Sequence, residues 1–350
     1  MPSFHELLQD TKVRGSVFDI IRREWLAKLA AHTGRNLIIY YSGWLQKPGT
    51  SGVQVTDADK NGFMTVIHGL DRTKGLDLVL HTPGGETSAT ESIVDYLHSM
   101  FGTDIRAIVP QLAMSAGTMI ACAAREIVMG KQSSLGPIDP QFGGIPAHGI
   151  VEEFKRAYKE VKDDPAKIPV WQPIIAKYHP TLIGECEKAI DWSNEMVRDW
   201  LARGMFSGDS QSQQKIDSIL QELADHSLTK SHARHLSARK CQAIGLKVTA
   251  LEEDQVFQDL VLSLHHACIL TLGGTAASKI IENQKGVAFI QVTQTLMVQG
   301  GPLQGPGQAE GDIPVVVPPT MPPLQDSPKP PEALRRPKSR SKRGRRRTRR

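Results

Sequence analysis

The sequence predicts an α/β fold with a mostly parallel sheet, and three observations lead to this prediction. Four short apolar runs of β-forming residues occupy residues 36–45, 76–82, 105–110 and 125–130. Residues 87–101, between the second and third runs, carry apolar side chains at helical spacing. Residues 111–124, between the third and fourth runs, look like the first turn of a buried helix followed by an apolar stretch. Strands that alternate with helices of this length form βαβ units, in which neighbouring strands run parallel.

The segments on either side of these units differ in character. Residues 1–35 are predicted to be helical and to stop at a glycine, and residues 151–272 to be mostly helical and charged. A β-like run at residues 286–296 closes the folded part. Proline and glycine, and then arginine, dominate the rest, which buries too little apolar surface to offset its ordering entropy. We therefore expect one domain over residues 1–298 and a disordered tail over residues 299–350.

Positive charge is concentrated at the C-terminal end. The whole chain of 350 residues has a formal net charge of +5, while the stretch from Lys329 onward holds 12 Lys/Arg and a single acid. The rest of the chain is therefore mildly acidic. Because the basic stretch has no aromatic residues, it can bind phosphates by counterion release but cannot stack on bases. We expect it to bind nucleic acid or an acidic partner, or to act as a solvated tail.

Composition favours a reduced, cytoplasmic protein. The N-terminal residues lack the apolar core of a signal peptide, and no stretch of about 18 residues is apolar enough to span a membrane. The four cysteines are far apart and have neither metal-site nor disulfide spacing. We therefore expect no membrane span, no metal and no cofactor.

Two polar segments imitate metal sites. Residues 56–62 begin like a calcium loop with Asp57 at its first position, but the twelfth position holds His68 instead of the bidentate glutamate. A polar turn is the prediction there. The adjacent His265 and His266 would point in different directions on a helix, which is poor geometry for one metal ion.

A pair of glycines follows the second predicted strand, in the sequence HTPGGETSATESI. Adjacent glycines between a strand and a helix allow a sharp turn and leave amide groups pointing outward, where they can stabilise an oxyanion. An ordinary turn between strand and helix is the alternative. His81, the first residue of this motif, is interpreted as a strand-end residue that braces the turn.

Ser115 lies in the sequence AMSAGT, directly after the third predicted strand. Because parallel strands end at the same edge of a sheet, Ser115 and Gly85 should meet there if the two strands are neighbours. A serine at a helix N-terminus lies in a positive field, and the amide of Ala116 can point to the same place. The alternative role for Ser115 is an ordinary helix cap. Ala116 and Gly117 keep the approach to the serine open and allow close packing.

The third motif, SSLGPIDPQFGG at residues 133–144, follows the fourth predicted strand. It reads as a loop that ends in two glycines. Asp139 lies 24 residues after Ser115 in this loop. Its carboxylate can orient a base or cap the turn.

The order of these three motifs resembles the Clp protease/crotonase superfamily, which includes the Clp proteolytic subunit and signal peptide peptidase A. The wording HTPGG, AMSAGT and LGPIDPQ is most similar to the serine dehydrogenase proteinase family within it, and the resemblance runs from Arg22 to Leu246. It implies a ββα spiral fold and a serine peptidase. By this resemblance Ser115 is the nucleophile, and the amides of Gly85 and Ala116 form the oxyanion hole.

The general base is where the sequence departs from the Clp pattern. Asp139 stands where the Clp subunit has its histidine, and a carboxylate with an ordinary pKa is a poor base for a serine hydroxyl. The candidates are His148, Lys155 and His232. We favour His148, oriented by Asp139, because it follows the same loop. Lys155 has charged neighbours typical of a solvated helix face.

Three functions compete on the sequence alone. The first is a serine peptidase acting on peptides or unfolded proteins, as a homo-oligomer like other members of the superfamily. The second is a catalytically silent scaffold of the same fold whose tail recruits nucleic acid or a partner. The third is an acyl-CoA enzyme of the crotonase type, against which the serine of AMSAGT argues.

Overall fold

The computed structural model describes residues 17–224 and 233–293. All of them belong to one compact unit that ends at Gln299. The predicted disordered tail lies outside the described residues.

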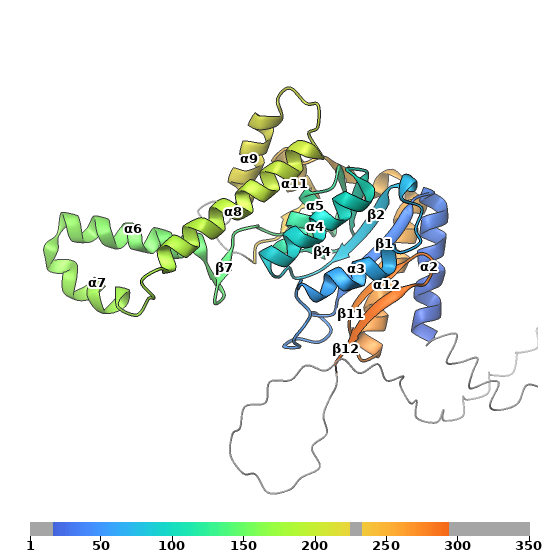
Figure 1. Cartoon of the computed structure of the whole chain (residues 1–350), viewed down its shortest axis with the longest axis horizontal. Coiled ribbons are helices and arrows are strands. Elements are labelled where there is room, and N and C mark those ends of the chain that lie inside the picture. The colour runs from blue at the N-terminus through green and yellow to red at the C-terminus, as the bar shows by residue number, and fades with distance from the viewer. Residues whose placement is uncertain (1–16, 225–232, 294–350) are drawn as a thin grey trace, which may run out of the picture. The chain divides into compact units, whose positions relative to one another are not determined.

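A seven-stranded sheet forms the centre of the described chain (Figure 1). Its strand order is β10-β5-β3-β2-β1-β11-β12. The strands from β10 to β1 run parallel, and β11 and β12 add an antiparallel edge next to β1. The strand bounds are β1 Asn36–Ser42, β2 Leu76–His81, β3 Ile105–Val109, β5 Glu126–Met129, β10 Val248–Ala250, β11 Ala277–Asn283 and β12 Ala288–Val292.

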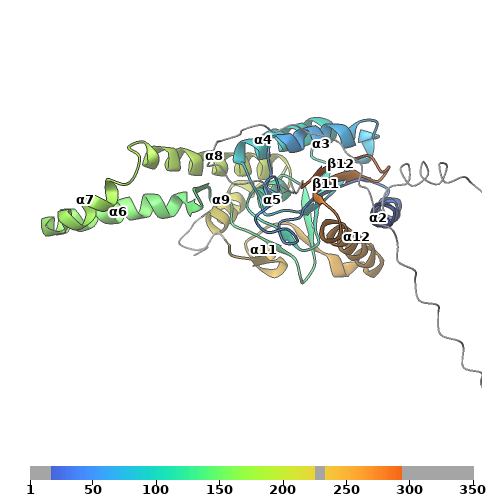
Figure 2. The same cartoon turned by 90° about the horizontal axis from the view of Figure 1, so that it is seen from below.

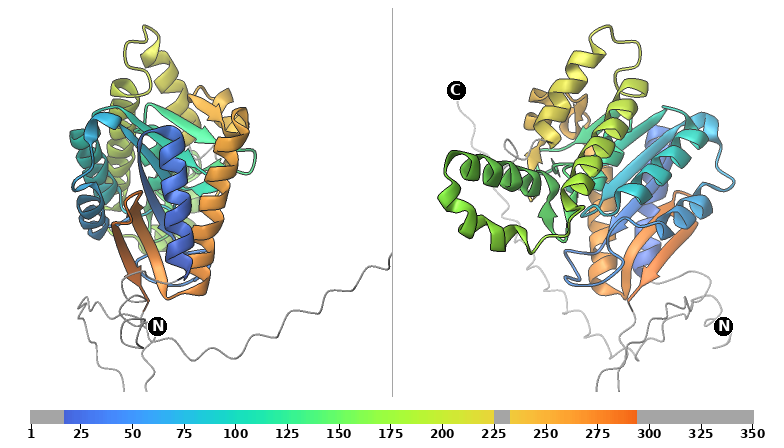
Figure 3. Two further views of the ribbon diagram at one scale, coloured as in Figure 1. Left: turned by 90° about the vertical axis from the view of Figure 1, so that its right-hand side faces the viewer. Right: turned by 60° about the vertical axis from the view of Figure 1, so that its left-hand side comes forward.

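Helices cover both faces of this sheet, so its strands are buried on both sides. On one face α2 (Val17–Thr33) and α12 (Gln255–Gly274) lie side by side (Figure 3). The other face carries α3 (Ala58–Ile67), α4 (Thr87–Phe101) and α5 (Ala116–Cys122). Side chains of a strand alternate between the faces, so Ile38 and Tyr40 join one apolar core while Leu37, Ile39 and Tyr41 join the other. Burial on both faces explains why the strands read as continuous apolar runs.

Helix α12 corrects one expectation from the sequence. By length and composition, Gln255–Gly274 is long and apolar enough to cross a membrane, contrary to the prediction that no such stretch exists. In the structure Val261, Leu264, Cys268 and Leu272 of this helix are buried in the core against α2 and the sheet. One face of the helix thus packs into the core, while 44% of the apolar span as a whole is buried and Val256 and Leu270 are exposed.

A helical arm extends to the side of the sheet away from α2 (Figures 1 and 2). It consists of α6 (Ala147–Asp163), α7 (Ile168–Ile175) and the first part of α8 (Leu182–Arg203), and a small apolar cluster holds α6 to α8. The remaining elements are η1 Arg72–Lys74, β4 Leu112–Ala113, β6 Ser134–Leu135, β7 Gln141–Phe142, β8 Ile145–Pro146, η2 Pro165–Lys167, α9 Ser212–Ala224, β9 Leu236–Ser237, α11 Ala238–Ala243 and η3 Leu251–Glu253.

The structure confirms the four predicted parallel strands and the helix at residues 87–101. The polar turn predicted at residues 56–62 was wrong, because helix α3 begins at Ala58. The helical region predicted to start at residue 151 begins at Ala147, and β10 and β11 were not foreseen. The closing β-run is the strand Ala288–Val292.

Candidate active site

Ser115 occupies a strained turn between β4 and α5. Its φ of 50° and ψ of −114° make it the only non-glycine residue with positive φ in the described chain. Such backbone conformations are rare outside glycine and persist where the surrounding structure holds them, often at functional sites. Ser115 stands at the N-cap position of α5, but its side chain makes no capping hydrogen bond. The ordinary capping role considered for this serine is therefore not the one it plays.

Gly84 packs directly on this serine. Its φ is +97°, and a Cβ built on it would lie 2.6 Å from Ser115 Cβ, 2.7 Å from the Met114 carbonyl oxygen and 3.0 Å from the Ala116 nitrogen. Only glycine fits both the conformation and the space. The sequence reasoning singled out Gly85 and missed Gly84. Its proximity to Ser115 depends on how the two turns pack, which no local sequence signal records.

Gly85 faces a different neighbour. A Cβ on Gly85 would lie 2.3 Å from both the nitrogen and the oxygen of Val55, and the two residues form a parallel β-bridge. Val55 N donates to Gly84 O at 2.8 Å, and Glu86 N donates to Val55 O at 2.9 Å. Gly85 is thus required by close backbone approach, not by a positive φ.

Two backbone amides remain available beside the serine. Within the described chain, the amides of Gly85 and Ala116 donate no hydrogen bond. The ideal Gly84 Cβ position lies near both Ser115 and the Ala116 nitrogen, so the glycine turn and the start of α5 meet there. Unused amides next to a nucleophile are the donors that an oxyanion hole needs.

Extension of the sheet brings the two motifs together. Beyond the end of β2, Thr82 N donates to Leu112 O at 3.1 Å and Met114 N donates to Thr82 O at 3.0 Å. A Cβ on Gly117 would lie 2.5 Å from Thr82 Cγ2, so α5 approaches this strand closely, as expected from its small residues. The condition for Ser115 and Gly85 to meet, that the second and third strands are neighbours, is fulfilled, because β2 pairs with β3.

A short hairpin brings the backbones of Asp139 and His148 close together. Strands β7 and β8 pair around Gly143 and Gly144, which have φ of +57° and +81°. Below this pairing, Ala147 N donates to Pro140 O at 2.9 Å. The backbones of Asp139 and His148 follow on opposite sides of the hairpin base. The glycine-ended loop predicted from the sequence is thus a hairpin.

The segment leading to Asp139 runs beside the Ser115 turn. Strand β6 pairs in parallel with β4, and Gly136 N then donates to the hydroxyl of Thr118 in α5 at 2.9 Å. A Cβ on Gly136 would lie 3.3 Å from Met114 Cα, next to Ser115. Asp139 is 1% exposed, a buried position for a carboxyl group.

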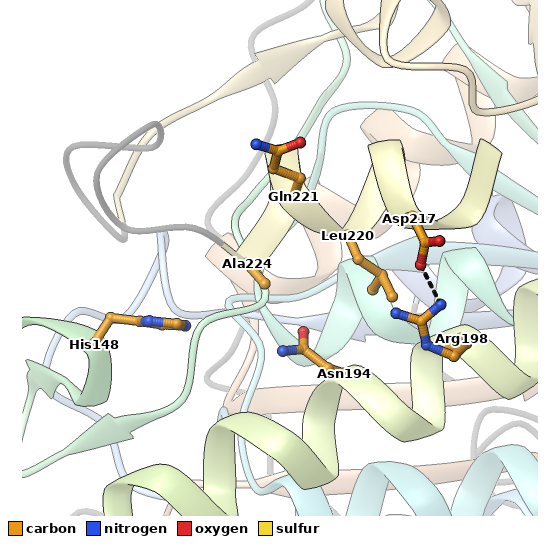
Figure 4. Close-up of a pocket in the computed structure, with 7 residues that line it drawn as sticks. All are labelled: His148, Asn194, Arg198, Asp217, Leu220, Gln221 and Ala224. Atoms are coloured by element: carbon orange, nitrogen blue, oxygen red, sulfur yellow. Dashed lines mark hydrogen bonds and ion pairs between the residues drawn. The ribbon is translucent and has the colours of Figure 1, made fainter. Parts of the chain in front are cut away.

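His148 borders a cavity of about 350 Å³ (Figure 4). Figure 4 shows His148 at one end and the Arg198–Asp217 ion pair at the other, with Asn194 between them. The full lining comprises His148, Asn194, Arg198, Asp217, Leu220, Gln221 and Ala224. Polar groups therefore line much of the space beside the candidate base.

The other candidate bases lie elsewhere. Lys155 is exposed on α6, in agreement with the solvated face predicted for it. His232 lies outside the described residues. His81 ends β2, as predicted. The centroid of its buried ring lies 4.4 Å from the ring centroid of Trp44 and 5.4 Å from that of His265. Burial, and then the neighbouring His265, lower the pKa of His81 to about 3, so it stays neutral.

Comparison with known proteins shows which family and which relatives this chain is similar to. Residues 53–268 match the family described as ClpP-like SDH-type serine proteinases. An uncharacterized protein of Methanocaldococcus jannaschii is 30% identical over 208 residues, which are 59% of this chain and 63% of the relative. A second uncharacterized protein of that organism is 38% identical over 110 residues, 31% of this chain and 38% of the relative. The chain thus spans less than two thirds of the length of either relative.

Proposed function

Because the chain belongs to the ClpP-like SDH-type serine proteinases, we propose that it cleaves peptide bonds through an acyl-enzyme on Ser115. The observation that carries this proposal is the strained, uncapped Ser115 turn packed against Gly84. The Ser115 hydroxyl makes no capping hydrogen bond to the helix it precedes, which leaves it available to a substrate. A substrate carbonyl can then approach it from the side of the glycine turn.

The amides of Gly85 and Ala116 serve as the oxyanion hole. When the serine oxygen attacks, negative charge develops on the carbonyl oxygen, and amides already held in place stabilise it without reorganising. Their lack of hydrogen bonds within the described chain supports this role. Collapse of the tetrahedral intermediate expels the amine and leaves the acyl group on Ser115, and water then releases it.

His148 acts as the base and Asp139 orients it. The hairpin that joins their backbones and the run of β6 beside Ser115 support this pair. The solvent exposure of Lys155 argues against a lysine base on α6, because a lysine needs desolvation to lose its proton at neutral pH. His232 is the remaining alternative.

Substrates are peptides or unfolded proteins, and the chain works as a homo-oligomer. The arm supports self-association, since Tyr158 on α6 is 72% exposed and Val170 on α7 is 61% exposed. Apolar side chains gathered on a projecting element are typical of contact surfaces. Light scattering at micromolar concentration tests this, because a measured mass near 38.5 kDa would mean that the chain is a monomer.

A fluorophosphonate probe tests the function directly. The wild-type chain should be labelled covalently, and Ser115→Ala should lose both the label and peptide hydrolysis while keeping its fold. Ser99→Ala is the matched control, because Ser99 is exposed on α4 and bonds only within its helix. Labelling that survives in Ser115→Ala would remove the nucleophile assignment. A wild-type chain that takes no label would leave the silent scaffold as the better reading.

A further inference from the structure

We propose that a buried ion pair between Asp59 and Lys279 is a positioning device that holds the glycine turn against Ser115. This inference rests on the proposed function, since the turn supplies the oxyanion amide. Asp59 lies in the first turn of α3 and Lys279 in β11, so the pair joins two elements 220 residues apart. We call it the Asp59–Lys279 clamp.

The clamp is fully buried and fully bonded. Both side chains are 0% exposed, and Lys279 Nζ donates to the two carboxylate oxygens of Asp59 at 2.8 and 2.9 Å. Burial lowers the pKa of Lys279, and the carboxylates of Asp59 and then Glu86 oppose that shift. The ammonium group therefore lies within the field of Glu86, at the start of α4.

The clamp grips the backbone on both sides of Val55. Lys279 Nζ donates to the carbonyl oxygen of Gln54 at 2.6 Å. The amide of Thr56 donates to Asp59 Oδ2 at 2.9 Å. Val55 therefore has one clamp contact before it and one after it. The backbone of Val55 is therefore held by charged groups as well as by apolar packing.

Val55 in turn holds the glycine turn. Its amide donates to Gly84 O at 2.8 Å, and its carbonyl accepts from Glu86 N at 2.9 Å. Gly85 lies between these two bonds, with its own amide directed elsewhere. Any shift of Val55 therefore moves the amide that the oxyanion requires. Oxyanion donors act only within about 0.5 Å of their working position, so a small shift matters.

A second connection leads from the clamp to the same turn. The Tyr40 hydroxyl donates to Asp59 Oδ2 at 2.8 Å. Burial and then the carboxylate of Asp59 raise the pKa of Tyr40 well above its usual value, and the nearby hydroxyls of Ser42 and Thr82 oppose this shift. Thr82 Oγ1 also accepts from Gly84 N at 3.2 Å. Tyr40, which bonds Asp59, and Thr82, which bonds Gly84, therefore lie close together between the clamp and the glycine turn.

Stability alone does not explain a buried ion pair. Replacing such a pair by apolar residues of similar volume is often neutral or stabilising, so the charges here supply position more than free energy. Lys279 of the clamp, and Tyr40, which donates to Asp59, lie outside residues 53–268, the part that matches the family. Strand β11 thus brings to the turn a contact from beyond the matched segment.

The experiment compares two buried ion pairs that each have one member on β11, the control one also holding the partly exposed Arg23, whose Nε bonds Glu282 Oε1 at 2.6 Å. The test variant combines Asp59→Asn with Lys279→Met, which removes both charges and leaves neither buried alone. The control combines Arg22→Met with Glu282→Gln. Arg22 Nε bonds Glu282 Oε2 at 2.6 Å, with both side chains 0% exposed, on the opposite face of β11. The control pair contacts neither Val55 nor the glycine turn.

Two readouts separate the clamp from the proposed function. Hydrogen exchange measures whether the amides of Val55 and Glu86 stay protected, whatever the chain catalyses. The rate of fluorophosphonate labelling and the kcat for a peptide measure the working site. Urea unfolding checks that both variants are folded.

In the test variant we expect these two amides to exchange at least about ten times faster than in the wild type. We expect fluorophosphonate to label it at about one tenth of the wild-type rate or lower, and its KM to be unchanged. The control should match the wild type in both readouts. Unchanged exchange in the test variant, or unchanged labelling despite faster exchange, would overturn the inference. Equal slowing in the control would overturn it too, because general destabilisation would then explain the loss. A wild type that takes no label would defeat the proposed function, and exchange would still decide whether the clamp holds the turn.

Discussion

Replacing Gly84 by alanine is the most direct test of the active-site geometry. The added methyl would lie 2.6 Å from Ser115 Cβ and 2.7 Å from Met114 O. Real Cβ atoms do not approach so closely, and one of these neighbours is backbone. The Ser115 turn or the glycine turn must therefore move. The φ of +97° at Gly84 adds conformational strain for any residue with a Cβ.

The expected loss has two parts that a control can separate. Gly69 has a φ of +72° with nothing within 4 Å of its ideal Cβ, so Gly69→Ala carries conformational strain alone. That strain costs about 1–2 kcal/mol of stability. Gly84→Ala should lose this amount and about 1–3 kcal/mol more from overpacking. Because the oxyanion amide shifts with the turn, activity should fall about 10²-fold or more.

The assay pairs urea unfolding with peptide hydrolysis and fluorophosphonate labelling. Gly69→Ala should lose stability but hydrolyse peptide at the wild-type rate under folding conditions. Gly84→Ala should be slow even where urea unfolding shows it fully folded. If folded Gly84→Ala reacts as fast as the wild type, the turn does not form part of the catalytic site.

Three further results are expected. His148→Ala should lose peptide hydrolysis almost as completely as removal of the nucleophile, because the two act as a unit, while Asp139→Asn should lose less; full activity in the histidine variant would exclude it as the base. Burial lowers the pKa of His81 to about 3 and that of His265 to about 4, so both rings are neutral when folded and take up protons below about pH 6.5 only when unfolded. The free energy of unfolding should therefore be constant above that pH and fall on acidification by up to about 1.4 kcal/mol per pH unit for each ring. In urea unfolding, the free energy of His81→Leu should fall less steeply with acidification than that of the wild type. Deleting residues 329–350 should leave peptide hydrolysis unchanged and abolish any salt-sensitive binding to nucleic acid, and binding that persists in filter assays would place it elsewhere.

Local patterns in the sequence account for much of the fold. Residues 87–101 carry apolar side chains at helical spacing, and α4 has those bounds. The strands β2 and β3 read as apolar runs because helices cover both of their faces. By contrast, β11 contains Lys279 and Glu282, charged residues that argue against a central strand. Those charges are matched by partners in α3 and α2, which only the folded chain brings near.

The active site divides in the same way. Ser115 and Gly85 lie in short motifs at strand ends, so their meeting at one sheet edge could be predicted. The positive φ of Ser115 and the contact of Gly84 with it depend on tertiary packing. The sequence places Asp59 in a polar turn, because its partner, Lys279, is remote in sequence. A buried ion pair of this kind leaves no local pattern to read.

The position of β11 in the chain affects when the site matures during synthesis. Lys279 leaves the ribosome 220 residues after Asp59, an interval of roughly 10–45 s at about 5–20 residues per second. Until then a nascent chain already carries Ser115 and both glycines but lacks the contact that seats Val55. If the clamp positions the glycine turn as proposed, the oxyanion amide therefore reaches its place late, after the helical arm and most of the core have been translated.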